Sequence, residues 1–132
     1  MIEKQILQGL IQDEEYVRQV LPFLKQDYFT QLEHGLIYNV ISEYFDKYNA
    51  LPKVSALEVD IQQRTGVDEK TIASALELVQ SFETIAVDQW LVDQTESFCQ
   101  DKAIYNAIMS GISIIEKKPD DKGQLPGLLQ EA

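Results

Sequence analysis

The chain offers few residues whose types and spacing point to chemistry. The only histidine, His34, has no cysteine or second histidine at the spacing of metal ligands, so we expect no metal site. The only cysteine, Cys99, has no histidine near it in the sequence and is expected to be a packed or half-exposed thiol. Among the 22 acidic residues, no pair stands apart as a general acid and base. We therefore predict no catalytic, cofactor-binding or metal-binding residue, and no enzymatic activity for this chain.

The charge pattern argues against direct contact with nucleic acid. The net charge is −11, and the 11 basic residues are scattered except for Lys117, Lys118 and Lys122. Proteins that bind DNA usually gather Lys and Arg to neutralise phosphates. The sequence also lacks a G-x-x-x-x-G-K-[ST] run, the motif that cradles nucleotide phosphates. We expect the chain to bind neither DNA nor ATP by itself.

The composition predicts a single cytoplasmic domain without a membrane segment. A chain of 132 residues is long enough for one modest core. The single cysteine suits a reducing compartment, and the start, with Glu3 and Lys4, does not resemble a signal peptide. The uncharged run Ala103–Ile115 is shorter than the ~20 residues that a membrane span requires.

The spacing of apolar residues predicts helices almost everywhere and no confident strand. We expect an all-α fold, with a small helical globule of about five or six helices followed by a long projecting helix. Thr30 and Glu33 form a capping-box pattern at the start of one strong helix. The expected segments are a globular part at 1–86, the long helix at 87–118, and at 119–132 a loop followed by the start of a further helix, either a second arm packed against the long helix or a linker helix.

The long helix is predicted to carry two apolar faces. At ~100° per residue, one stripe runs along the whole helix and is expected to face the core; it comprises Val87, Trp90, Leu91, Phe98 and Tyr105. After Ala103 the opposite flank also turns apolar, which predicts contact with a second helix or subunit. The alternative is that this half is buried inside its own domain. The predicted interface comprises Ile104, Ala107, Ile108, Gly111, Ile112, Ile114 and Ile115.

Three stretches of the sequence, in order, resemble the N-terminal domain of the DnaB family of replicative helicases. They are EKQILQGLIQD, DYFTQLEHGLIYNVISEYFDKYNALP and DQWLVDQTESFCQDKAIYNAI, and together they cover most of residues 2 to 116. The sequence around Trp90 and Thr95 is most similar to that of the helicases of T-even-type phages. These are packing patterns rather than catalytic signatures.

The resemblance implies a helical globule followed by an α-hairpin, with the long helix as the first arm. It implies that hairpins of neighbouring subunits pair, that the pairs build a collar on a hexameric ring, and that the collar contacts primase. The family's ATPase motor lies in a further domain, so the full-length protein would be a DNA helicase that uses ATP and Mg²⁺. DNA would be contacted through the full-length ring. The second arm is expected to begin near Gln124 and to be cut short at Ala132.

A different class of function stays open on the residues alone. An acidic helical chain without a motor also fits a free-standing adaptor or regulator that binds a host protein. The reading frame beyond Ala132 distinguishes the two readings, because a P-loop sequence there favours the helicase and a stop codon favours the adaptor. If the protein is phage-encoded, its location would be the host cytoplasm.

Overall fold

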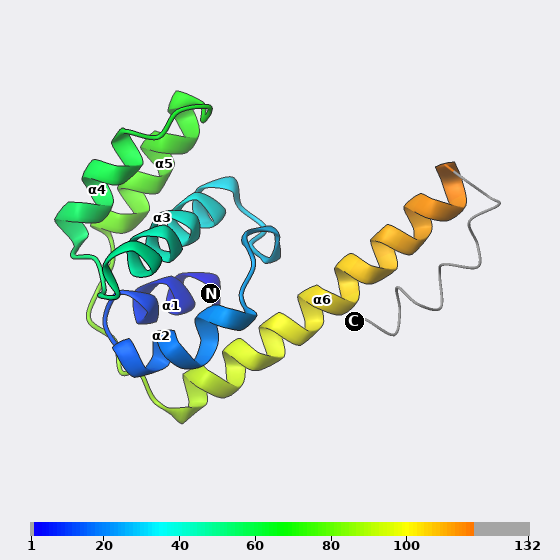
Figure 1. Cartoon of the computed structure of the whole chain (residues 1–132), viewed down its shortest axis with the longest axis horizontal. Helices are drawn as coiled ribbons and strands as arrows, with labels where there is room; N and C mark the ends of the chain where they lie inside the picture. The colour runs from blue at the N-terminus through cyan, green and yellow to red at the C-terminus, as the bar shows by residue number, and fades with distance from the viewer. Residues whose placement is uncertain (1, 118–132) are drawn as a thin grey trace. The chain divides into compact units, whose positions relative to one another are not determined.

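The computed structural model describes the backbone of residues 2–117 and the side chains of residues 2–112. Within that range the chain forms six α-helices and two short 3₁₀ turns, without a strand (Figure 1). The prediction of an all-α globule followed by a long final helix is confirmed. The expected segment 119–132 lies outside the described residues. The elements are α1 (Ile2–Leu10), α2 (Glu14–Val20), η1 (Leu21–Phe23), η2 (Gln26–Tyr28), α3 (Leu32–Tyr48), α4 (Val54–Gln62), α5 (Glu69–Gln80) and α6 (Gln89–Lys117).

The chain divides into two compact units, Met1–Thr95 and Glu96–Ala132. The boundary falls inside α6, so the first two turns of that helix belong to the first unit. The division that we expected at 86 and 87, at the start of the long helix, stays a prediction.

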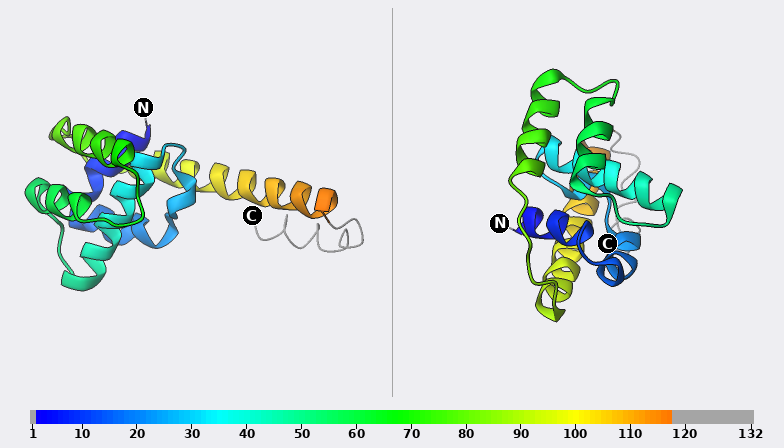
Figure 2. Two further views of the ribbon diagram at one scale, coloured as in Figure 1. Left: turned by 90° about the horizontal axis from the view of Figure 1, so that it is seen from above. Right: turned by 90° about the vertical axis from the view of Figure 1, so that its left-hand side faces the viewer.

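The core of the first unit forms around α3. This helix contacts α1, α4 and α5, and α4 and α5 pack side by side (Figures 1 and 2). Leu36, Ile37, Val40 and Ile41 recur along α3 with the helical period, which turns these four side chains to one buried side. Fully buried side chains come from all four helices: Ile6, Leu7 and Leu10 of α1, Ile37, Val40 and Ile41 of α3, Leu57 and Ile61 of α4, and Ala75 of α5.

The start of α3 differs from the prediction. Thr30 does not cap the helix, because Gln31 is the N-cap residue and no side chain accepts a hydrogen bond there. Instead, the Thr30 backbone N–H and hydroxyl donate to the carboxylate of Glu3, at 3.1 and 2.8 Å. The His34 Nδ1 lies 2.8 Å from the same carboxylate. Glu3 is buried and its charge requires donors, so it takes the hydroxyl that the capping box would have used.

Gly9 marks the point where α1, α2 and the first turn of α6 come together. A Cβ at Gly9 would lie 2.8 Å from a ring carbon of Tyr16 and 3.1 Å from a methyl of Leu91. The Tyr16 hydroxyl lies 2.6 Å from the Thr95 hydroxyl, which donates to the carbonyl of Leu91 at 2.7 Å. Since the Thr95 proton is used in that bond, Tyr16 is the donor to Thr95. The missing side chain at Gly9 thus lets a buried hydrogen-bonded chain form beside it.

Candidate interaction surface

The first half of α6 is organised by one buried face. Asp88 precedes the helix, and its carboxylate accepts a hydrogen bond from the backbone N–H of Leu91 at 3.1 Å, which satisfies one of the free donors of the first turn. The buried residues follow at helical spacing and share one side of the helix. They are Leu91, Thr95, Phe98 and Cys99.

This buried face corrects the predicted core stripe. Leu91 and Phe98 are buried, but Trp90 and Tyr105 are each 59% exposed, so their assignment to the core is wrong. Val87 precedes the helix and is half-buried. At 100° per residue, the buried face is turned by roughly 70° from the predicted stripe. The prediction followed the large apolar side chains, whereas the buried face combines two of them, Leu91 and Phe98, with the smaller Thr95 and Cys99.

Exposed apolar side chains gather in the second half of α6. Ile104, Ile108 and Ile112, which we call the isoleucine row, are 46%, 44% and 42% exposed. They recur at i, i+4 and i+8 and therefore share one helix face. Tyr105 and Met109 are exposed beside them. Concentrated exposed apolar area of this kind is typical of interaction sites.

The other predicted interface residues differ in exposure. Ala107 is half-buried and Gly111 is buried. The side chains of Ile114 and Ile115 lie outside the described residues. The assignment of the whole set to an interface therefore stays a prediction, in which the isoleucine row is the part that the structure shows to be accessible.

The thiol of Cys99 does not have the surroundings of a nucleophile. It is buried, and burial raises its pKa to about 11. Reactive cysteines depend on the thiolate and have a lowered pKa. Among the described side chains of residues 2–112, no three of His, Cys, Asp or Glu are grouped so that they could hold a metal ion.

The Glu3–His34 pair was missed by sequence reasoning, which considered His34 only as a possible metal ligand. Both side chains are buried. Burial raises the pKa of Glu3, but the hydrogen bonds with His34 and Thr30 lower it by a larger amount. The pKa of Glu3 therefore lies below its ordinary value of 4.5. The sequence did contain an indication that His34 is buried, because His34 shares a helix face with Ile37 and Ile41, at i+3 and i+7. The pair joins α1 to α3 and has a structural role.

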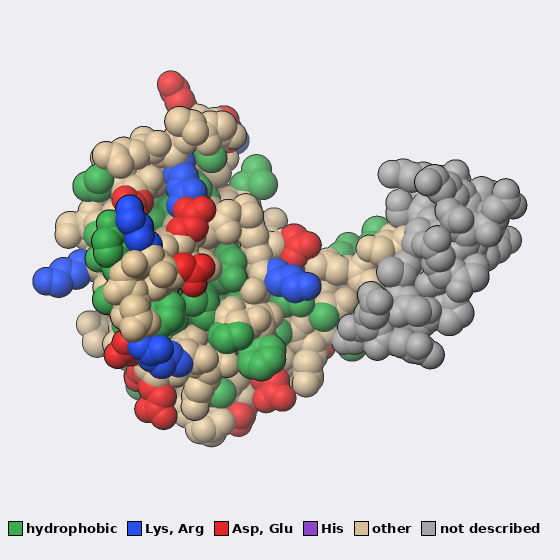
Figure 3. Space-filling model, viewed as in Figure 1, with side chains coloured by type: hydrophobic (Ala, Val, Ile, Leu, Met, Phe, Trp, Pro, Cys, Tyr) green, Lys and Arg blue, Asp and Glu red, His purple; other side chains and the backbone are tan. Residues whose placement is uncertain are grey.

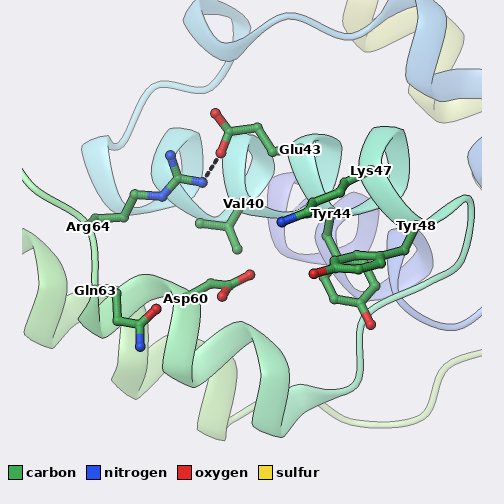
Figure 4. Close-up of a pocket in the computed structure, with 8 residues that line it drawn as sticks. All are labelled: Val40, Glu43, Tyr44, Lys47, Tyr48, Asp60, Gln63 and Arg64. Atoms are coloured by element: carbon green, nitrogen blue, oxygen red, sulfur yellow. Dashed lines mark hydrogen bonds and ion pairs between the residues drawn. The ribbon is translucent and has the colours of Figure 1, made fainter.

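A shallow hollow of about 290 Å³ lies between α3 and α4 (Figure 4). Arg64 and Glu43 form an ion pair across it, and the Tyr44 and Tyr48 rings pack together at 4.7 Å between centroids. The remaining charged residues of its lining, Lys47 and Asp60, are of opposite sign. The hollow therefore has no excess of one charge that would select an ionic ligand.

One face of the molecule can be examined for a basic patch, and it has none. On the face drawn in Figure 3, Lys and Arg side chains are interspersed with Asp and Glu. Separately, no helix among residues 2–117 combines the length and the apolar character required to cross a membrane.

Comparison with known proteins supports the resemblance found in the sequence. Residues 1–109 match the family of the DnaB-like helicase N-terminal domain. A protein of Enterobacteria phage T4 described as a DnaB-like replicative helicase is 26% identical over 138 aligned positions. The alignment covers 96% of this chain but only 29% of the T4 protein, so the chain corresponds to a minor part of that relative. The family match spans the globule and α6 as far as Met109, and the chain belongs to the DnaB-like helicase N-terminal domain family.

Proposed function

We propose that the chain is the N-terminal collar domain of a hexameric, ATP-dependent replicative DNA helicase of the cytoplasm, and that it joins subunits and docks primase at the replication fork. The carrying observation is the family match over residues 1–109, which includes most of the isoleucine row. The helicase activity, with its need for ATP and Mg²⁺, belongs to the full-length protein in this proposal. DNA is contacted through the assembled ring.

The exposed face of α6 supports the assembly part of the proposal. Three isoleucines on one helix face remain between 42% and 46% exposed. Full burial of an exposed isoleucine side chain contributes roughly 1.5–3 kcal/mol, and each of these partly exposed side chains would contribute a fraction of that when the face pairs between subunits. In this proposal the row lies on the first arm of the family's α-hairpin.

Self-association tests this surface directly. Ile108→Asp introduces a charge into the middle of the row, and Leu32→Asp is a matched control on α3, where Leu32 is 76% exposed. Sedimentation velocity of the full-length protein should show that Ile108→Asp shifts the distribution towards smaller species while Leu32→Asp does not. Circular dichroism should show that both variants keep wild-type helicity. An unchanged distribution for Ile108→Asp would remove the isoleucine row from the interface.

Primase docking requires a second measurement. The full-length protein should bind its cognate primase in isothermal titration calorimetry, and deleting residues 1–117 should abolish that binding while the remaining protein still hydrolyses ATP. If the deleted protein binds primase with undiminished affinity, docking lies elsewhere. A stop codon after Ala132 in the reading frame would instead favour a free-standing adaptor that binds a host protein.

A further inference from the structure

The segment between α5 and α6 has no helical structure of its own and is held by two glutamines. Gln8 and Gln12 lie at i and i+4 at the end of α1 and in the turn after it, so both reach the same side. The Gln8 side-chain oxygen accepts from the backbone N–H of Glu83 at 2.9 Å. The Gln12 side chain accepts from the N–H of Ile85 at 2.9 Å and donates to the carbonyl of Glu83 at 2.7 Å.

These three bonds imitate the pairing of a β-strand. The Gln12 amide presents one acceptor and one donor to the backbone of the segment, as a neighbouring strand would. Gln8 is 3% exposed and Gln12 is exposed, so one of these hydrogen-bonding residues lies in the interior and the other at the surface. All three contacts are made to backbone atoms of the segment.

Few side chains hold the segment in addition to these bonds. Among residues 82–88 no side chain is fully buried, and Phe82, Ile85 and Val87 are half-buried. A hollow of about 350 Å³ lies beside its first residues, lined by Ile11 and Leu51 among others, so Phe82 is incompletely packed. By contrast, α6 is fixed after the segment by the buried Leu91 and by the Thr95–Tyr16 hydrogen bond.

We propose that residues 82–88 form a strap that opens and closes on α1 as one unit, with Gln8 and Gln12 as its clasp. Regions with few buried apolar contacts and partly exposed hydrogen bonds open locally before the whole domain unfolds. The strap is the covalent link from α5 to α6. Its opening frees residues 82–88 while α5 before it and α6 after it remain folded, and this behaviour does not depend on the helicase assignment.

Native-state hydrogen exchange, measured by NMR on the chain, tests the proposal. The amides of Glu83 and Ile85 should exchange faster than that of Ile37 in the core, and their opening should be insensitive to low concentrations of urea. Gln12→Ala should raise the exchange rate of Ile85 about tenfold, as expected for the loss of the two hydrogen bonds that the Gln12 side chain makes. Ile37, which exchanges only when the whole domain unfolds, should still exchange far more slowly than Ile85 in this variant.

Matched variants isolate the clasp. Gln12→Glu keeps an acceptor for the Ile85 N–H but sets a carboxylate oxygen against the Glu83 carbonyl in place of the amide donor, so it too should raise the exchange rate of Ile85. Gln19→Ala, at an exposed position of α2, should leave every strap amide unchanged. If Gln12→Ala does not alter the Ile85 rate, the clasp is refuted. If the strap amides and Ile37 respond identically to urea, the strap does not open independently.

Discussion

The hydroxyl of Tyr16 and the hydroxyl of Thr95 lie 2.6 Å apart, and this buried bond joins α2 to the second turn of α6. Thr95→Val keeps the shape of the side chain but removes the hydroxyl, so we expect it to lower the free energy of unfolding by about 1–2 kcal/mol. Thr95→Ser keeps the hydroxyl and should cost less. Urea denaturation followed by circular dichroism measures both. Equal stability of the Val variant and the wild type would contradict a role for this bond.

Acid should weaken the link between α1 and α3. The folded-state pKa of Glu3 is lowered from its ordinary value of 4.5, so the folded protein favours the ionised carboxylate more than the unfolded chain does. The stabilisation is therefore fully present above about pH 5 and is lost as the pH falls through the lowered pKa. Glu3→Gln should reduce stability at neutral pH and flatten its dependence between pH 5 and 3. Thermal denaturation of the wild type and Glu3→Gln across that range tests the expectation, which parallel pH profiles for the two proteins would contradict.

Adjacent residues of α6 should respond very differently to truncation. Leu91 is 1% exposed, and Leu91→Ala should lower the free energy of unfolding by about 2–5 kcal/mol because it leaves a cavity. Trp90 is 59% exposed, and Trp90→Ala should change stability by less than about 0.5 kcal/mol. Urea denaturation of the two variants provides the comparison. A larger loss for Trp90→Ala would restore the predicted core stripe.

Cys99 should react slowly with thiol reagents in the folded protein. With a pKa of about 11, roughly one thiol in a thousand is ionised at pH 8, whereas a free cysteine with a pKa of about 8.5 is ionised to roughly a quarter. Modification by Ellman's reagent at pH 8 should therefore be more than about a hundredfold slower in the native protein than in urea. Comparable rates in the two conditions would contradict the burial of the thiol.

Helix existence was predictable because apolar residues keep one period over long stretches. In α3, Leu36, Ile37, Val40 and Ile41 recur at a spacing that only a helix turns to one side. The same reasoning failed for buried polar residues, which a hydrophobic period assigns to the surface. Glu3 is buried because Thr30 and His34 supply donors from 27 and 31 positions away. No local pattern contains that information.

The orientation of α6 was mispredicted for a related reason. The predicted stripe includes the large side chains of Trp90 and Tyr105, which are exposed, whereas the buried side includes Thr95, which a hydrophobic period does not select. Burial on the observed side depends on Thr95, whose hydroxyl finds a partner in Tyr16, 79 positions earlier. It also depends on Gly9, where the absence of a side chain admits Leu91. Thr95 of α6, together with Tyr16 and Gly9 far earlier in the sequence, thus determines which face of α6 is buried.

The strap has a consequence for how its sequence can change. Gln8 and Gln12 bind the backbone of the strap. The path of the strap is therefore determined by residues outside it and depends little on most of the strap's own side chains. Glu83, Thr84 and Ala86 point outwards and can be exchanged with little effect on that path. Proline is the exception at Glu83 and Ile85, because it has no N–H to offer the glutamines. The amino-acid sequence of the connection between α5 and α6 can therefore change during evolution while its backbone path is retained.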